Sequence, residues 1–159
     1  MSYGNEKITY KWARDCQWAP AMDLVWRTYL RFEGDVYTQE GNRNFYEFIT
    51  DRELHQSFLE GRYLMMLALE GEKVVGVATL RNRNHLSLLF VDEAYHRQGI
   101  GSALLQEMEN FVKTRMEEQH ILVKSSPYAV EFYQRVGFRT VAPPQSVEGM
   151  LVTPMLKEL

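Results

Sequence analysis

The chain has almost no cysteine. Cys16 is the single cysteine in 159 residues, so an intramolecular disulfide framework and a metal site built from several cysteines are both excluded. Such low cysteine usage is typical of a reducing compartment, and the opening sequence MSYGNEKITYKW contains no apolar run of the kind found in signal peptides. We therefore expect a cytoplasmic protein.

The chain also lacks a strong charge of either sign and a long apolar run. Its 18 Lys and Arg side chains and 21 Asp and Glu side chains leave a net charge of −3, so no global field draws it to nucleic acid or to an anionic membrane. No segment approaches the roughly 18 uninterrupted apolar residues that a membrane span requires. We expect neither nucleic acid nor a membrane as a partner, and any anion site has to be local.

Repeats, low-complexity tracts and Pro/Gly/Ser-rich linkers are absent as well, and His55 and His120 have no neighbour at the spacing of a metal site. We therefore expect no metal. With 45% hydrophobic residues, a chain of this length has the size of one domain, and a second independent core is not expected. The sequence predicts a single domain over residues 1–159.

What is present is a regular order of elements. In the first half, alternating residues predict a strand over 8–12, and an apolar stripe that follows Pro20 predicts a helix that ends near Gly34. A second helical region is expected over 42–59, with Thr50-Asp51 as the candidate break. One strand and two helical regions therefore open the order.

Three strands are expected next. β-branched, aromatic and aliphatic residues dominate 63–69 and 73–80, and the glycine-containing segment between them has the length of a hairpin loop. After a polar turn, the apolar sequence HLSLLFV at 85–91 predicts a third strand that is buried on both faces. These early strands are expected to be antiparallel.

The second half alternates helices with strands. Apolar residues at helical intervals predict a helix that starts near Gly101, and a short buried strand is expected over 121–124. A helix is expected over 127–135, and a final strand over 149–156 with Pro154 near an edge or bulge. The whole pattern is that of a mixed α/β fold.

The segment Gly99-Ile100-Gly101 connects a predicted strand to a predicted helix. The first N–H groups of a helix have no partner within the helix, so a glycine turn at this point is suited to binding phosphate. The P-loop pattern fails because no Gly-Lys-Ser/Thr follows, and the Rossmann pattern fails because Leu104 occupies the third glycine position. On local grounds, a plain glycine-containing turn remains an equal alternative.

Two longer stretches resemble the GNAT superfamily of N-acetyltransferases. LLFVDEAYHRQGIGSALL is similar to its acyl-CoA-binding segment, whose pattern Gln/Arg-x-x-Gly-x-Gly/Ala falls on residues 96–101, with His96 in place of Gln or Arg. SSPYAVEFYQRVGF, at 125–138, resembles the later family segment Asn-x-x-Ala-x-x-Phe-Tyr-x-x-x-Gly-Phe, with Ser126 where Asn is common. Two motifs in the right order are far more specific than either one alone.

The resemblance implies a fold and a co-substrate. The fold is a mixed, mostly antiparallel central sheet of six to seven strands flanked by about four helices, and the co-substrate is acetyl-CoA. The family strand before the glycine turn carries a bulge and splays from its neighbour, so that unpaired main-chain groups bind the pantetheine arm while turn amides bind the pyrophosphate. The resemblance assigns co-substrate binding to Leu89, Phe90, Val91, His96, Arg97, Gln98, Gly99, Ile100, Gly101, Ser102, Ser126 and Tyr133.

The implied reaction is direct transfer of an acetyl group to a primary amine in a ternary complex. The amine, with a reference pKa of about 10, must first lose a proton. His85 and Glu33 are the candidate bases, with Asp35 beside Glu33 as a further candidate. A main-chain N–H near Leu89 is the expected oxyanion donor. Tyr133 is the candidate general acid for the departing thiolate.

Other interpretations stay open on the sequence alone. The chain is also compatible with a non-catalytic acyl-CoA-binding regulatory module, while a nucleotide-phosphate-binding protein of another fold is disfavoured. The acceptor is a small-molecule or peptide amine that the sequence does not identify. A homodimer is a further option, because the apolar carboxy-terminal strand could pair with a second copy of the chain.

Overall fold

The computed structural model describes residues 7–159. The first six residues, part of the opening sequence considered above, lie outside the described residues. The helices are α1 (Trp18–Glu33), α2 (Gln39–Ile49), α3 (Arg52–Leu59), α4 (Ile100–Thr114) and α5 (Val130–Arg135), and the short 3-10 turns are η1 (Asp15–Gln17), η2 (Glu93–Tyr95) and η3 (Pro127–Ala129). The strands are β1 (Ile8–Trp12), β2 (Leu64–Glu70), β3 (Lys73–Arg81), β4 (His85–Val91), β5 (His120–Ser125), β6 (Arg139–Thr140), β7 (Gln145–Val147) and β8 (Met150–Glu158).

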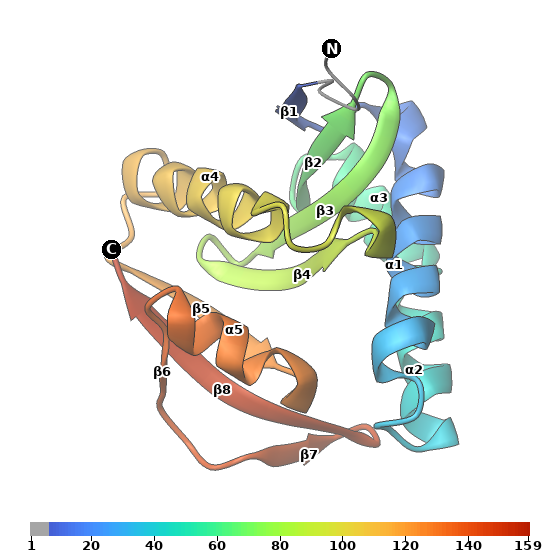
Figure 1. The fold of residues 1–159 in the computed structure, drawn as a ribbon, viewed down its shortest axis with the longest axis vertical. Helices are drawn as coiled ribbons and strands as arrows, with labels where there is room; N and C mark the ends of the chain where they lie inside the picture. The colour runs from blue at the N-terminus through green and yellow to red at the C-terminus, as the bar shows by residue number, and fades with distance from the viewer. Residues whose placement is uncertain (1–6) are drawn as a thin grey trace.

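The strands form a sheet of eight in the order β1-β2-β3-β4-β5-β8-β6, with β7 beside β8. All paired neighbours are antiparallel except β4 and β5, which are parallel and are connected through α4. The fold is therefore the mixed, mostly antiparallel α/β arrangement that the resemblance implies. Figure 1 shows α4 and α5 in front of the sheet and α1 along its side.

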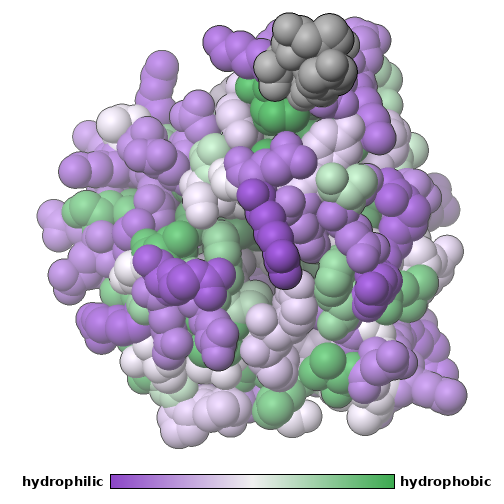
Figure 2. Space-filling model, viewed as in Figure 1, coloured by the Kyte–Doolittle hydropathy of each residue, from purple (hydrophilic) through white to green (hydrophobic). Residues whose placement is uncertain are grey.

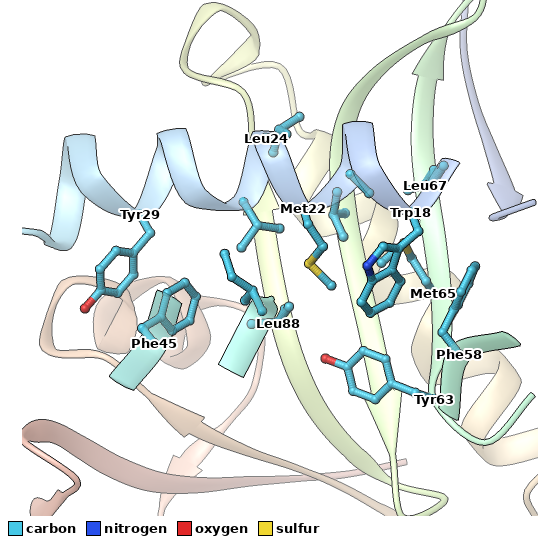
Figure 3. Packing of buried hydrophobic residues seen from close by; sticks show 14 of the residues in the cluster. Trp18, Met22, Leu24, Tyr29, Phe45, Phe58, Tyr63, Met65, Leu67 and Leu88 are labelled. Carbon is cyan, nitrogen blue, oxygen red and sulfur yellow. The ribbon is translucent and has the colours of Figure 1, made fainter. Parts of the chain in front are cut away.

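Each face of the sheet has its own apolar core. One core joins α1, α2 and α3 to the sheet, and in it Tyr29 stacks on Phe45 with ring centroids 4.0 Å apart (Figure 3). The other core joins α4 and α5 to the opposite face and includes the buried Leu104 and Met108. Polar side chains cover much of the face shown in Figure 2, with smaller apolar areas between them. Among the described helices, none is both long and apolar enough to cross a membrane.

Most of the expected elements are present, with differences at their ends. The strands over 8–12 and 85–91 have the predicted bounds. The region 42–59 is divided at Thr50-Asp51, and the division makes five helices where about four were expected. Helix α1 begins at Trp18 rather than at Pro20. Proline is tolerated in this first turn because the N–H groups there have no intrahelical acceptor.

Strand β4 is not buried on both faces throughout. Leu86 and Leu88 are buried, whereas the other residues of the strand are only half-buried. The two leucines belong to opposite cores although they are two positions apart, because the register with β3 shifts by one residue between them and leaves Ser87 as a bulge. The apolar residues at 88–91 therefore belong to a bulged strand that is only partly covered, and not to a strand that is buried on both faces.

The carboxy-terminal strand is internal to the sheet, contrary to the expectation of an edge or bulge at Pro154. β8 pairs with β5 along one side, and β6 and β7 fold back onto its other side. Pro154 lies opposite Lys124 of β5, and its carbonyl accepts a hydrogen bond of 3.0 Å from the Val141 N–H. The two short strands also raise the sheet from six or seven strands to eight. The homodimer stays a prediction, and it would need a contact other than the edges of β8.

Candidate active site

A cleft opens where β4 and β5 separate. The two strands pair only at His85–Leu122 and Leu86–Val123, and they diverge beyond this point (Figure 1). The cleft has a volume of about 870 Å³ and is bounded by the end of α1, by β4, by the glycine turn and by α5. The predicted co-substrate residues that line it are Leu89, Phe90, Val91, His96, Arg97, Gly99, Ile100, Gly101, Ser102 and Tyr133.

Along the cleft, the main-chain groups of successive β4 residues point alternately toward β3 and toward the gap between β4 and β5. The Asp92 N–H donates to the Val75 carbonyl at 2.9 Å, so Asp92 faces β3. Because sides alternate along a strand, Phe90 also directs its main-chain groups to β3, whereas Leu89 and Val91 direct theirs toward the gap. This placement revises the expectation for Phe90, which contributes its side chain to the α1 face core. The main-chain groups of Leu89 and the N–H of Val91 are open to a ligand, whereas the Val91 carbonyl accepts a hydrogen bond from His96.

The glycine turn directs the first amides of α4 at the cleft. Arg97 and Gly99 both have positive φ, 65° and 77°, and Gly99 is the N-terminal cap of the helix. The first helical N–H with an acceptor in this turn is that of Ala103, which donates to the Gly99 carbonyl at 3.0 Å. The preceding amides, of Ile100 through Ser102, are thus the unsatisfied first turn of a 15-residue helix. Gln98 is exposed beside the turn but does not line the cleft.

His96 holds the turn against β4. Its Nε2–H donates to the Val91 carbonyl at 2.7 Å, and its ring stacks on Phe32 of α1 with centroids 5.0 Å apart. The side chain therefore joins the end of β4, the turn and α1. The family pattern has Gln or Arg at this position. In this chain His96 replaces them and connects β4, the turn and α1 through these two contacts.

Tyr133 lies at the inner end of the cleft on α5. The helix ends two residues later at Arg135, and the Phe138 N–H donates back to the Tyr133 carbonyl at 2.8 Å while the Gly137 N–H donates to the Gln134 carbonyl. The Tyr133 side chain is 5% exposed and its ring packs edge-on against Phe132 and Phe138. Burial, and secondarily the negative charge of Glu33, raises its pKa above the usual value. Its hydroxyl therefore keeps its proton at neutral pH.

Glu33, at the end of α1, lines the same cleft as Tyr133. The side chain is 9% exposed, and burial raises its pKa to about 7 although a hydrogen bond with the Ser126 side chain lowers it. Ser126 also hydrogen-bonds Tyr37, whose pKa is raised by burial and by Glu33. Ser126 thus contacts Glu33 but does not line the cleft. A carboxyl group with a pKa near 7 can take up or release a proton at physiological pH.

His85 is placed differently from Glu33. It stands at the opposite end of β4 from the glycine turn and does not line the cleft. Burial, together with the positive charges of Arg81 and Lys124, lowers its pKa to about 4. A histidine with this pKa is a weak base at neutral pH. Asp35 is exposed beyond the end of α1 and is likewise absent from the lining.

Comparison with known proteins agrees with the geometry. The family model described as an acetyltransferase (GNAT) domain matches residues 33–159, which is most of the chain and includes both motifs. The chain belongs to the GNAT acetyltransferase family. The N-acetyltransferase YafP of Escherichia coli (strain K12), itself uncharacterized, is 38% identical over 61 residues. That match covers 38% of this chain and 37% of YafP, so the chain aligns with little more than a third of its curated relative.

Solved GNAT structures share the fold. A GCN5-related N-acetyltransferase from Rhodopseudomonas palustris superposes with a TM-score of 0.83 at 21% identity, over 95% of each chain. The PaiA N-acetyltransferase from Thermoplasma acidophilum, solved in complex with coenzyme A, superposes with a TM-score of 0.79 at 16% identity, over 96% of this chain and 99% of that one. At these identities the likeness concerns the fold.

The GNAT cleft of this chain contains residues that sequence reasoning did not select. Thr28 and Phe32 of α1 line it together with Tyr128, Phe132 and Arg135 from the η3–α5 segment. Phe132 and Arg135 belong to the second motif, so their position in the motif was a usable signal. Thr28 carries no signal in the sequence, whereas Phe32 is one of the aromatic residues near the amino-terminal helices that the sequence leaves open between core packing and an acceptor pocket. In residues 7–159, no group of three or more His, Cys, Asp or Glu is placed to hold a metal ion.

Proposed function

We propose that the chain is an acetyl-CoA-dependent N-acetyltransferase that transfers the acetyl group directly to a primary amine in a ternary complex. The observation that carries the proposal is the meeting of three features in one cleft. These are the open main chain of β4, the first-turn amides of α4, and the adjacent Glu33 and Tyr133. Each suits one requirement of the reaction.

Binding uses main-chain groups. The pantetheine amides pair with the main-chain groups of Leu89 and with the Val91 N–H as an added strand would, because these groups are directed into the gap. The pyrophosphate lies on the amides at the start of α4, where the helix dipole favours negative charge. Arg97 and Arg135 line the same cleft and supply positive charge. The CoA complex of the PaiA relative is consistent with such a use of the fold.

The reaction then needs three proton transfers. Glu33, as the carboxylate, accepts a proton from the ammonium group of the acceptor directly or through water, and the neutral amine nitrogen attacks the thioester carbonyl. The N–H of Leu89 stabilises the oxyanion that forms. The intermediate collapses by breaking the carbon–sulfur bond, and the Tyr133 hydroxyl donates its proton to the leaving thiolate. The nitrogen gives up its second proton, which returns to the Tyr133 oxygen directly or through water. The products are the N-acetylated amine and free CoA.

Two measurements test the proposal in sequence. Acetyl-CoA should raise the melting temperature of the protein while ATP and NAD do not, because only the former fills both the gap and the turn. Thiol release with a panel of small and peptide amines should then identify turnover. Stabilisation by acetyl-CoA without thiol release from any amine would support the non-catalytic binding module. The absence of stabilisation at millimolar acetyl-CoA would contradict both.

A further inference from the structure

A tyrosine hydroxyl is buried where β3 and β4 lose register. Tyr63 directly precedes β2 and is 3% exposed. Its ring packs near Trp18, and its hydroxyl is at the end of the ring away from Phe58 (Figure 3). The hydroxyl oxygen lies 2.7 Å from Thr79 Oγ1 and donates to Ser87 Oγ at 2.9 Å. Because it donates to Ser87, it accepts from Thr79, and the three hydroxyls form a chain.

The two partners of Tyr63 flank the β-bulge. Thr79 pairs with Leu88 and the next residue of β3, Leu80, pairs with Leu86, so that Ser87 is the extra residue of β4. Ser87 has no Cα partner on β3 in this register. Its hydrogen bond to Tyr63 ties the extra residue to the body of the sheet. Thr79 is fully buried, so the β3 end of the chain of hydroxyls is fixed as well.

The bulge determines which residues of β4 face the cleft. Main-chain groups alternate sides along a strand, so one extra residue reverses the alternation beyond it. With the bulge at Ser87, Leu88 and Phe90 face β3 and Leu89 and Val91 face the gap. Without it, the same ladder would direct Leu89 and Val91 into β3 and leave no main-chain group of theirs for a ligand.

We propose that Tyr63 is a positioning residue whose hydroxyl fixes the bulge at Ser87 and thereby directs the main chain of Leu89 and Val91 into the cleft. Tyr63 does not line the cleft and touches no reacting atom. Its kinetic consequence rests on the proposed function, whereas its effect on β4 is measurable without catalysis.

The test removes one oxygen atom at a time. In Tyr63→Phe we expect amide hydrogen exchange at Leu88 and Phe90 to become at least 10-fold faster, because their bonds to β3 open when the bulge is mobile. We also expect kcat for acetyl transfer to fall about 10-fold, with the pH dependence of the rate unchanged because Glu33 is not altered. Ser87→Ala should give the same two changes, and adding it to Tyr63→Phe should change little more, since both remove one interaction.

Tyr10→Phe is the matched control. Tyr10 lies on β1 opposite Ala68, away from the bulge, and its loss of a hydroxyl should leave both the exchange at Leu88 and kcat unchanged. Exchange and kcat in Tyr63→Phe equal to those of the wild type, or of Tyr10→Phe, would overturn the proposal. If Tyr63→Phe does not fold, the same two measurements on Ser87→Ala decide. If the wild type transfers no acetyl group, the proposed function fails, and exchange at Leu88 and Phe90 alone still decides the role of Tyr63.

Discussion

Glu33 is a buried carboxyl group whose protonation affects the stability of the fold and, in the proposed mechanism, catalysis. Its pKa is raised by burial to about 7, so the folded protein binds its proton more tightly than the unfolded chain does. The stability linked to Glu33 is therefore full below the unfolded pKa, near 4.5, and is lost as the pH rises through about 7. At pH 8 the protein carries a buried charge that the fold disfavours, and the proposed mechanism uses this charge as the base.

We predict that Glu33→Gln raises the free energy of unfolding at pH 8 by up to about 3 kcal/mol and changes it little at pH 4.5. The same substitution should lower kcat about 100-fold and remove the rising limb near pH 7 from the pH–rate profile. Urea unfolding at both pH values and kinetics across pH measure the two effects. The exposed neighbour Asp35→Asn is the control and should change neither. Loss of the limb in His85→Ala, with its retention in Glu33→Gln, would assign the base to His85 instead.

Tyr133 is the general acid of the proposed mechanism. Tyr133→Phe removes only the hydroxyl from a well-packed ring, so we expect the melting temperature to change little. kcat should fall about 100-fold because the thiolate then leaves without a proton donor, while the Kd for acetyl-CoA stays within about twofold. Stopped assays of thiol release and calorimetric titration measure these quantities. Wild-type turnover across the pH range would remove Tyr133 from the mechanism.

At the scale of elements, the two glycines of the glycine turn, Gly99 and Gly101, are required for different reasons. Gly99 needs its hydrogen side chain for backbone conformation, since its φ is 77°. Gly101 lies within α4, and a Cβ built there would meet only Val91 Cγ2 at 3.6 Å and Phe132 Cζ at 3.7 Å, which is ordinary contact. The fold therefore does not require glycine at 101. Close approach of a ligand to the helix amides is the remaining reason for it.

We therefore predict opposite effects of Gly101→Ala on folding and on binding. Alanine favours a helix over glycine by roughly 0.5–1 kcal/mol, so the free energy of unfolding should stay constant or rise. The Kd for CoA should increase about 10-fold, because the added methyl group lies between the pyrophosphate and the amides. Chemical denaturation and calorimetry measure the two changes. Unaltered CoA affinity in Gly101→Ala would contradict phosphate binding at this turn.

At the scale of the whole molecule, the turn between β7 and β8 is hydrogen-bonded to α2, although the two segments are more than a hundred residues apart in the sequence. The Thr38 hydroxyl accepts from the Gly41 N–H at 3.0 Å and donates to the Gly149 carbonyl at 3.3 Å, and Asn44 donates to the Glu148 carbonyl at 2.7 Å. The two glycines touch, because a Cβ on Gly41 would lie 2.5 Å from the Gly149 oxygen. This contact joins the α1–α2 region, which carries Glu33, to the last two strands.

We predict that Gly41→Ala destabilises the protein by about 1–3 kcal/mol, because a methyl group inserted between two backbones forces them apart. The melting temperature should fall by roughly 5 °C. Glu40→Ala, an exposed change one residue earlier in the same helix, should remain within about 0.5 kcal/mol of the wild type. Equal melting temperatures for the two variants would show that the hairpin does not depend on this contact.

Much of the molecule is predictable because it depends on local pattern. Apolar periodicity and glycine positions place the hairpin of β2 and β3, the glycine turn and α4, and the two motifs identify the family. The short β6 and β7 escape prediction because two or three residues carry no period. The resemblance implies a bulge in β4, but its position at Ser87 escapes prediction because a one-residue change of register is a property of two strands together. Phe90 was therefore expected to offer main-chain groups that it directs to β3.

The amino-acid sequence by itself determined the class of fold, the family and the two motifs, because these depend on residue types at short spacing. Only the tertiary structure distinguishes the surroundings of the two candidate bases. Glu33 and His85 are both titratable residues near expected active-site elements, but burial is a property of the packed molecule. Burial raises the pKa of the one within the cleft to about 7 and lowers the pKa of the other, outside it, to about 4.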